Sequence, residues 1–365
     1  MRVSLVISAI IITTVSVLSF LYSPRFGRNP QREILERIGA SANYRGGKFQ
    51  NLSPRINIFS EKSFFQAVRD FLFTKVEGLT PLTPLPSMKV NLKEISREEN
   101  VMVWLGHSSL FIQIDRERFL IDPVLVAGSP VSFFNKPFKG AEAYSPEDIP
   151  DIDYLLITHD HWDHLDYEAV ISIKNRVGKV ICGLGVGEHF RHWGYNKKDI
   201  MELDWNESAM LKNDIALHIL PAQHFSGRKF IGRDKTLWVS FMIVAPSLNI
   251  FISGDTGYSK HFFEIGQRFP TIDFAIFEFG QYGYDWRDIH LMPNDLVQAI
   301  KELNPKRSFA AHNSKYALAK HPWKAPLEFV SKLSEEHKFN IITPMMGELV
   351  YLEDCSQKFT KWWEE

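Results

Sequence analysis

The sequence is poor in cysteine, in net charge and in internal repeats. Its 365 residues include only two cysteines, Cys182 and Cys355, so a disulfide framework does not organise the fold. The 42 basic and 43 acidic residues leave a net charge of −1, without the basic excess that is typical of nucleic-acid-binding proteins. No short-period repeat is visible. The balanced charge favours a main partner other than nucleic acid, and the 45% of apolar residues are enough for a large buried core.

An uncharged, mostly apolar run occupies Val3–Tyr22. As a helix, such a run of about 20 residues is long enough to span a hydrocarbon layer about 30 Å thick. The terminal position and the short basic start favour a cleaved secretory signal, whereas the length and the lack of an A-x-A cleavage site favour an uncleaved anchor. We expect residues 1–23 to be the anchor and the protein to be membrane-associated through it. The flanking charges leave the side of the membrane open.

The rest of the chain divides into an extension, a main domain and a short tail. Residues 24–96 are expected to form the extension, with an amphipathic helix that packs on the main domain or faces lipid, followed by a proline-rich linker. Residues 97–355 show two groups of strands with helices, which is typical of a layered α/β sandwich. Residues 356–365 are expected to be the tail. The expected helices are 63–75, 167–175, 293–303 and 326–333, and the expected strands are 101–105, 110–114, 118–121, 154–158, 179–182, 215–220, 238–244, 249–253, 274–277, 308–311, 341–343 and 349–352.

Four candidate metal ligands lie within six residues that directly follow the expected strand 154–158: His159, His161, Asp163 and His164. The end of a strand is held by the sheet, while the side chains that follow it can converge on an ion. Imidazole and carboxylate ligands suit zinc, and also iron or manganese. A single catalytic ion that keeps an open position needs fewer ligands than this run offers. The run therefore predicts two ions.

Three more candidate ligands stand at equivalent places elsewhere in the chain. His224, Asp255 and His312 each follow a short apolar stretch that is expected to be a strand. One such residue would more often be structural, but three in the same relative position, together with the first run, favour a shared site. A polar surface loop is the alternative interpretation of the first run, and it leaves these matching residues unexplained.

The pattern H-x-H-x-D-H, then a lone His, an Asp in a Gly-Asp-Thr-Gly context and a final His, resembles the metallo-β-lactamase superfamily over about residues 101–352. The resemblance implies an αββα sandwich with a site at one edge, between two β-sheets. It also implies that Asp255 bridges the two ions. The ligands of one ion would be His159, His161 and His224, and those of the other Asp163, His164 and His312. Such a pair of ions lowers the pKa of a shared water and neutralises charge on the attacked group.

Longer stretches resemble the branch that contains N-acylphosphatidylethanolamine-hydrolysing phospholipase D, and they lie at residues 104–109, 122–123, 150–159, 223–228 and 253–258. This resemblance implies hydrolysis of a phospholipid phosphodiester at a membrane surface, with Asp163, Asp255 and His290 as catalytic groups. His290 would donate a proton to the leaving group or bind a phosphate oxygen, unless it only marks a helix start. His107 would support the metal ligands or be a buried structural histidine. Arg228 and Lys315 would contact phosphate or be plain surface charges.

Other functions compete with this hypothesis. The first is hydrolysis of a small soluble ester, lactone or phosphorylated sugar, as in ascorbate-6-phosphate lactonases. The second is a metal-binding scaffold without catalysis. Zinc is the expected metal, with iron and manganese as alternatives. The oligomeric state, including a homodimer, is left open by the sequence.

Overall fold

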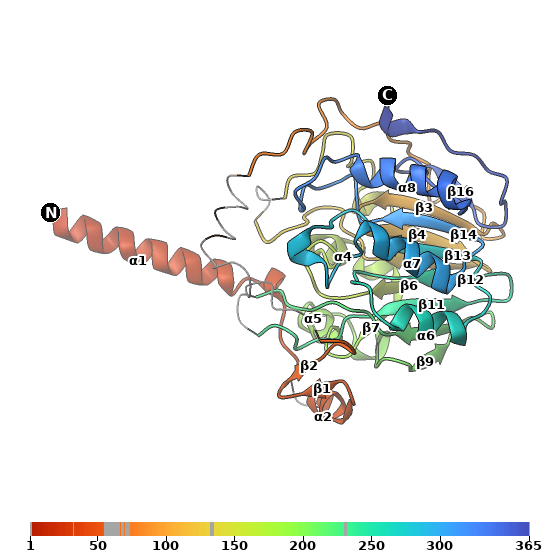
Figure 1. The fold of residues 1–365 in the computed structure, drawn as a ribbon. Helices are drawn as coiled ribbons and strands as arrows, with labels where there is room; N and C mark the ends of the chain where they lie inside the picture. Colours follow the sequence, from red (N-terminus) through yellow and green to blue (C-terminus); the bar gives the residue numbers. More distant parts are fainter. Residues whose placement is uncertain are drawn as a thin grey trace.

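The computed structural model describes residues 2–31, 33–54, 66, 69, 74–131, 135–229 and 232–364. In this part of the chain, two seven-stranded β-sheets lie face to face with helices on their outer sides (Figure 1). The first sheet has the order β16-β3-β4-β5-β6-β7-β8. Its strands are β3 (Val101–Gly106), β4 (Ser109–Ile114), β5 (Glu117–Ile121), β6 (Ile152–Ile157), β7 (Val177–Gly183), β8 (Ile200–Leu203) and β16 (Leu349–Tyr351).

The second sheet has the order β15-β14-β13-β12-β11-β10-β9. Each sheet is antiparallel in one half and parallel in the other, and the parallel halves are β5 to β8 and β12 to β15. Because parallel strands end at the same edge, several strand ends meet there in each sheet. The strands of the second sheet are β9 (Ser208–Met210), β10 (Ala216–Leu220), β11 (Ser240–Val244), β12 (Asn249–Ile252), β13 (Phe274–Glu278), β14 (Arg307–Ala311) and β15 (Ile341–Ile342).

The core has three apolar layers that follow the two faces of each sheet. Along β6, Tyr154 and Leu156 pack between the sheets, whereas Leu155 and Ile157 pack outward, as the two-residue period of a strand requires. The outward face of the first sheet is covered by α4 (Tyr167–Ile173) and α5 (Gly187–His192). The second sheet packs outward against α6 (His261–Arg268), α7 (Pro293–Leu303) and α8 (Ala325–His337). The layer order is αββα, the sandwich that the family resemblance of the ligand pattern implies.

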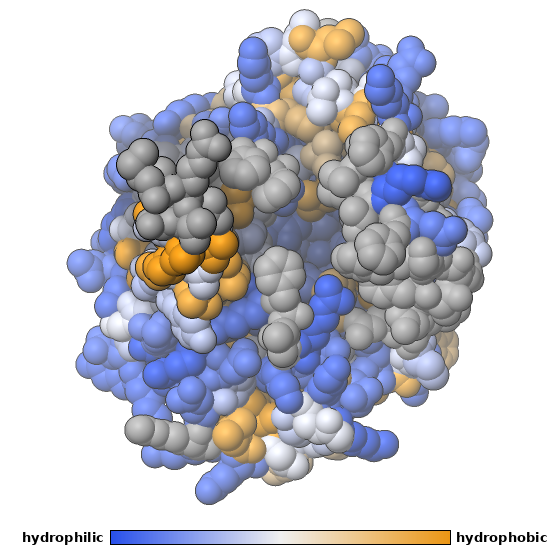
Figure 2. All heavy atoms as spheres, turned by 90° about the vertical axis from the view of Figure 1, so that its left-hand side faces the viewer, coloured by the Kyte–Doolittle hydropathy of each residue, from blue (hydrophilic) through white to orange (hydrophobic). Residues whose placement is uncertain are grey.

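The N-terminal run forms helix α1 (Arg2–Leu21), which projects away from the sandwich (Figure 1). Among the described residues, no helix combines the length and the apolarity that crossing a bilayer demands. The prediction of a membrane-spanning anchor in residues 1–23, and of membrane association through it, is therefore wrong. A span needs about 20 predominantly apolar residues, and six of the 20 residues of α1 are serine or threonine. Figure 2 shows the face from which α1 projects, with a hollow near its centre and apolar side chains gathered beside it.

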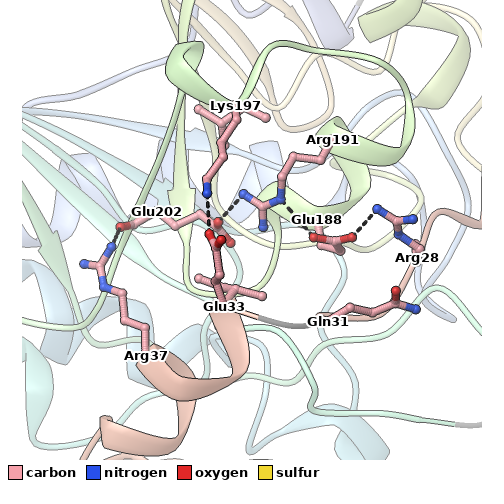
Figure 3. Close-up of a pocket in the computed structure, with 10 residues that line it drawn as sticks. Arg28, Gln31, Glu33, Arg37, Glu188, Arg191, Lys197 and Glu202 are labelled. Atoms are coloured by element: carbon pink, nitrogen blue, oxygen red, sulfur yellow. Dashed lines mark hydrogen bonds and ion pairs between the residues drawn. The ribbon is translucent and has the colours of Figure 1, made fainter.

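The extension docks on the main domain through ion pairs. It contains α2 (Glu33–Ala40) and the short hairpin β1 (Tyr44–Arg45) and β2 (Lys48–Phe49). Around a cavity of about 540 Å³ (Figure 3), Glu188 of α5 pairs with both Arg28 and Arg191, and Lys197 pairs with Glu33. These ion pairs neutralise the charged side chains where the extension meets the main domain. The expected amphipathic helix at 63–75 lies almost wholly outside the described residues.

Two features of the sandwich differ from the expected elements. The strand expected at 238–244 begins only at Ser240, because the N–H groups of Leu237 and Val239 bind the carbonyls of Leu184 and Thr158, at the end of the first sheet. In the segment 356–365, expected as a tail, Trp362 is 1% exposed and its ring centroid lies 6.4 Å from that of Trp104. Both contacts join segments that are far apart in the sequence.

Candidate metal centre

The four strand ends that carry candidate ligands meet at one edge of the sandwich. The ligand run follows β6 of the first sheet, and the other ligands follow β10, β12 and β14 of the second sheet. All seven predicted ligands come together there, although no two of the four segments are adjacent in sequence. Among the described residues, ligand atoms gather in three groups of four: His159, His161, His224 and Asp255 in the first, His107, Asp163, His164 and His312 in the second, and Asp255, Glu278, His290 and His312 in the third. Asp255 also contacts His164 and His312 of the second group, so it links the two sets of predicted ligands.

In the first group, the nitrogens converge on a small volume. His161 Nδ1 lies 2.8 Å from His159 Nε2 and 3.2 Å from His224 Nε2. Asp255 Oδ2 lies 3.9 Å from His159 Nε2 and 3.7 Å from His224 Nε2. Atoms this close suit the ligands of one ion with metal–nitrogen bonds of about 2.1 Å.

The second group is built in the same way around the other oxygen of Asp255. Asp255 Oδ1 lies 3.1 Å from His164 Nε2 and 3.3 Å from His312 Nε2. Asp163 Oδ2 lies 3.4 Å from His312 Nε2. Since Asp255 turns one carboxylate oxygen toward each group, it stands where a bridging ligand would stand.

Hydrogen bonds behind the ligands decide which nitrogen of each ring faces the centre. His164 Nδ1 lies 2.8 Å from Asp122 Oδ2, and His224 Nδ1 lies 2.9 Å from the carbonyl of Ile289, so in both rings Nδ1 carries the hydrogen. The Nε2 atom of each ring therefore points toward the other candidate ligands. His164 Nε2 lies only 3.1 Å from His312 Nε2. Two imidazole nitrogens this close in the protein interior, beside the buried oxygens of Asp255, fit a cation between them.

The electrostatics of the site favour the ligand forms of three of these groups, whereas the carboxylates of Asp255 and Asp122 raise the pKa of His164 well above its usual value. Burial and the neighbouring imidazoles hold the pKa of His159 and His224 well below the usual value, so both rings are neutral at pH 7. Burial alone would raise the pKa of Asp163, but hydrogen bonds from His107 and His312 hold it well below the usual value. Neutral imidazole and ionised carboxylate are the forms that bind a metal.

Of the other predicted site residues, His107 and His290 lie beside the ligands. His107 is fully buried, and its Nε2 lies 3.1 Å from Asp163 Oδ2, so it supports a candidate ligand. The ring of His290 lies 5.3 Å from that of His224 and 5.5 Å from that of His312, between centroids. His290 is 7% exposed.

Arg228 and Lys315 have different surroundings from those expected. Both are buried, and their charged groups donate to backbone carbonyls rather than pointing into solvent. Arg228 binds the carbonyls of Asp160, Leu165 and Arg25, which ties the ligand run to the extension. Lys315 Nζ donates to the carbonyl of Val124 at 2.7 Å.

Sequence reasoning missed three buried carboxylates that support the centre. Asp122 follows β5 and binds His164, so the strand-end signal that located the ligands could have found it. Asp160 lies inside the ligand run, and it accepts hydrogen bonds from Thr236 and from the backbone N–H of Gly227. Glu278 ends β13 and lies 3.3 Å from His290. In the sequence, Glu278 is marked only as an acidic residue within the apolar stretch 274–279.

Comparisons with known proteins agree with this geometry. A model of the beta-lactamase superfamily domain matches residues 117–313. An uncharacterized protein of Mycobacterium tuberculosis is 32% identical over 315 residues, which cover 85% of this chain and 84% of that protein. An N-acyl-phosphatidylethanolamine-hydrolyzing phospholipase D of Caenorhabditis elegans is 28% identical over 251 residues, which cover 64% of this chain and 69% of the relative.

One solved structure bears on the range of metals in this fold. The diiron β-hydroxylase CmlA of Streptomyces venezuelae superposes with a TM-score of 0.54 at 18% identity, over 71% of this chain and 55% of its own. It shares the fold and is described as a diiron protein, so the fold does not by itself select zinc. The αββα layers, the converging ligand groups and these matches agree, and the chain belongs to the metallo-β-lactamase superfamily.

Proposed function

We propose that this protein hydrolyses a phosphodiester bond in a phospholipid in the manner of a phospholipase D, with N-acyl phosphatidylethanolamine as the leading substrate. The observation that carries the proposal is the position of Asp255, whose two carboxylate oxygens face different ligand groups. This arrangement suits a pair of metal ions that act together on a phosphodiester. The choice of phospholipid rests on the likeness to the relative from Caenorhabditis elegans.

The residues of this chain have separate parts in that reaction. His159, His161 and His224 would hold one ion and Asp163, His164 and His312 the other, with Asp255 between them. When bound, the two ions would lower the pKa of a water and polarise the phosphoryl oxygens. His290 would give a proton from Nε2 to the leaving oxygen.

Aromatic side chains beside the centre support an apolar substrate. The ring of Phe225 lies 4.3 Å from that of His161, and the ring of Trp286 lies 5.7 Å from that of His290, between centroids. Tyr284, two residues before Trp286, is 63% exposed. Apolar rings at the edge of a polar centre provide contacts for acyl or glycerol parts of a lipid.

The test uses purified, metal-loaded full-length protein on vesicles that contain N-acyl phosphatidylethanolamine. We expect mass spectrometry to detect phosphatidic acid and N-acylethanolamine in equal amounts, and His159→Ala to abolish both. Vesicles of other phospholipids and a set of soluble esters, lactones and phosphorylated sugars serve as comparisons. Turnover of a soluble compound without release of phosphatidic acid from any vesicle would refute the proposal.

A further inference from the structure

Glu278, at the end of β13, is a buried carboxylate to which the reaction described above gives no part. Its side chain is 3% exposed. Oε1 accepts the backbone N–H of Leu291 at 2.6 Å, whereas Oε2 is buried and has no well-formed hydrogen bond to any described residue. An unsatisfied carboxylate oxygen in the protein interior is costly. Its position therefore calls for a donor nearby.

Two imidazole nitrogens face this oxygen and lack hydrogen-bond partners of their own among the described residues. Oε2 of Glu278 lies 3.3 Å from His290 Nδ1 and 3.8 Å from His312 Nδ1. Both nitrogens are buried without a well-formed hydrogen bond. The two rings are nearly parallel, with an angle of 18° between their planes. One carboxylate oxygen has the lone pairs to accept an N–H from each ring.

We propose that Glu278 is a positioning residue that accepts the Nδ1–H groups of His290 and His312 together. With the hydrogen held on Nδ1, Nε2 of His312 is left unprotonated toward the other ligands. In His290, the same contact directs Nε2 toward the reacting side. The inference rests on the proposed metal centre, and it does not depend on which substrate is cleaved.

The segment that carries His290 strengthens this assignment. The carbonyl of Ile289 accepts a hydrogen bond from His224 Nδ1, and the N–H of Leu291 is bound by Glu278. On its other side the segment packs closely on Gly257, where an added Cβ would lie 2.2 Å from the carbonyl oxygen of Asp288. Glu278 thus lies beside His312 of one ligand group, and it binds a segment whose Ile289 carbonyl contacts His224 of the other.

The variant Glu278→Gln tests the proposal because it preserves size and the acceptor for Leu291, but it turns an N–H₂ group toward the two Nδ1 atoms. We expect the affinity for metal, measured by competition with a chelator, to fall about tenfold, which is at the low end for lost outer partners of metal ligands. With any substrate that the wild type cleaves, we expect kcat to fall about 10–100-fold with KM nearly unchanged. Glu278→Asp keeps the acceptor and should retain more of both.

Two further variants complete the design. Glu302→Gln changes a carboxylate on α7 that binds Tyr258 and Gln298, and it should alter neither property. His290→Ala should lower kcat but leave metal affinity unchanged. If Glu278→Gln matches Glu302→Gln in metal affinity, and a crystal structure shows both imidazole rings in place, the proposal is overturned. A wild type without turnover would defeat the proposed function alone, because metal affinity and ring orientation would still test the role of Glu278.

Discussion

Asp255 is the side chain on which both ligand groups depend, since each group contacts a different oxygen of its carboxylate. In Asp255→Asn, one group would face an amide N–H₂ in place of an oxygen. We expect elemental analysis to find at most one metal per chain instead of two. We also expect activity to fall more than about 100-fold, because loss of a residue that only supports a ligand already lowers activity by up to that factor. Asp273→Asn, at a carboxylate that pairs with Lys306 away from the centre, is the control. Two retained metals with normal turnover would argue against a bridging role.

Lys315 gives a prediction that depends on pH. Burial lowers its pKa to about 8 from the usual 10.5. Between these pH values, Lys315 is protonated in the unfolded chain but not in the folded protein. Its contribution to the free energy of unfolding therefore increases as the pH rises. We therefore expect the stability of wild type relative to Lys315→Met to increase from pH 8 to 10.5, measured by urea unfolding. A constant difference across this range would contradict the assigned pKa.

At the scale of elements, the extension is part of the scaffold of the centre. The side chain of Asn51 makes two hydrogen bonds to the backbone of His224. Its Nδ2 donates to the carbonyl at 2.8 Å, and its Oδ1 accepts the N–H at 3.0 Å. Phe26 packs edge-to-face on Trp162 of the ligand run, with 5.1 Å between centroids. A segment far from the ligand run in sequence therefore holds two parts of the site.

Asn51→Ala should show this dependence. It removes the two hydrogen bonds to the backbone of His224 and a third from Trp238 Nε1, and loss of buried hydrogen bonds costs about 1–3 kcal/mol in the free energy of unfolding. We also expect faster loss of metal to a chelator. Gln50→Ala is the matched control, because that exposed side chain binds only the carbonyl of Arg45 among the described contacts. Equal metal loss from the two variants would show that the extension does not support the centre.

At the scale of the whole molecule, the centre joins the two sheets, because one ligand run follows the first sheet and the others follow the second. Metal that binds only the folded protein stabilises it by about 2.7 kcal/mol per site at a concentration of 100 times the Kd. We expect chelation to lower the melting temperature by about 5–10 °C. Stepwise return of zinc, iron or manganese should restore it, and the metal effective at the lowest concentration would identify the preferred ion. An unchanged melting curve after complete metal removal would count against two sites that bridge the sheets.

The sequence by itself determined the layered fold and predicted the candidate ligands, because both follow from local patterns. A polar ligand after a short apolar strand is visible at His159, His224, Asp255 and His312, and the alternation along strands such as β6 marks two buried faces. The same local reasoning failed at α1, where a run of suitable length was taken for an anchor.

Only the tertiary structure decided which groups support the ligands. Glu278 lies 34 residues from His312 along the chain, and Asn51 lies 173 residues from His224. No periodicity or motif links such positions, since their contacts arise from the packing of two sheets and from an extension that folds back onto them. The candidate ligands could be predicted from the sequence because they follow short apolar strands, whereas the groups that support them are defined only by distance in space.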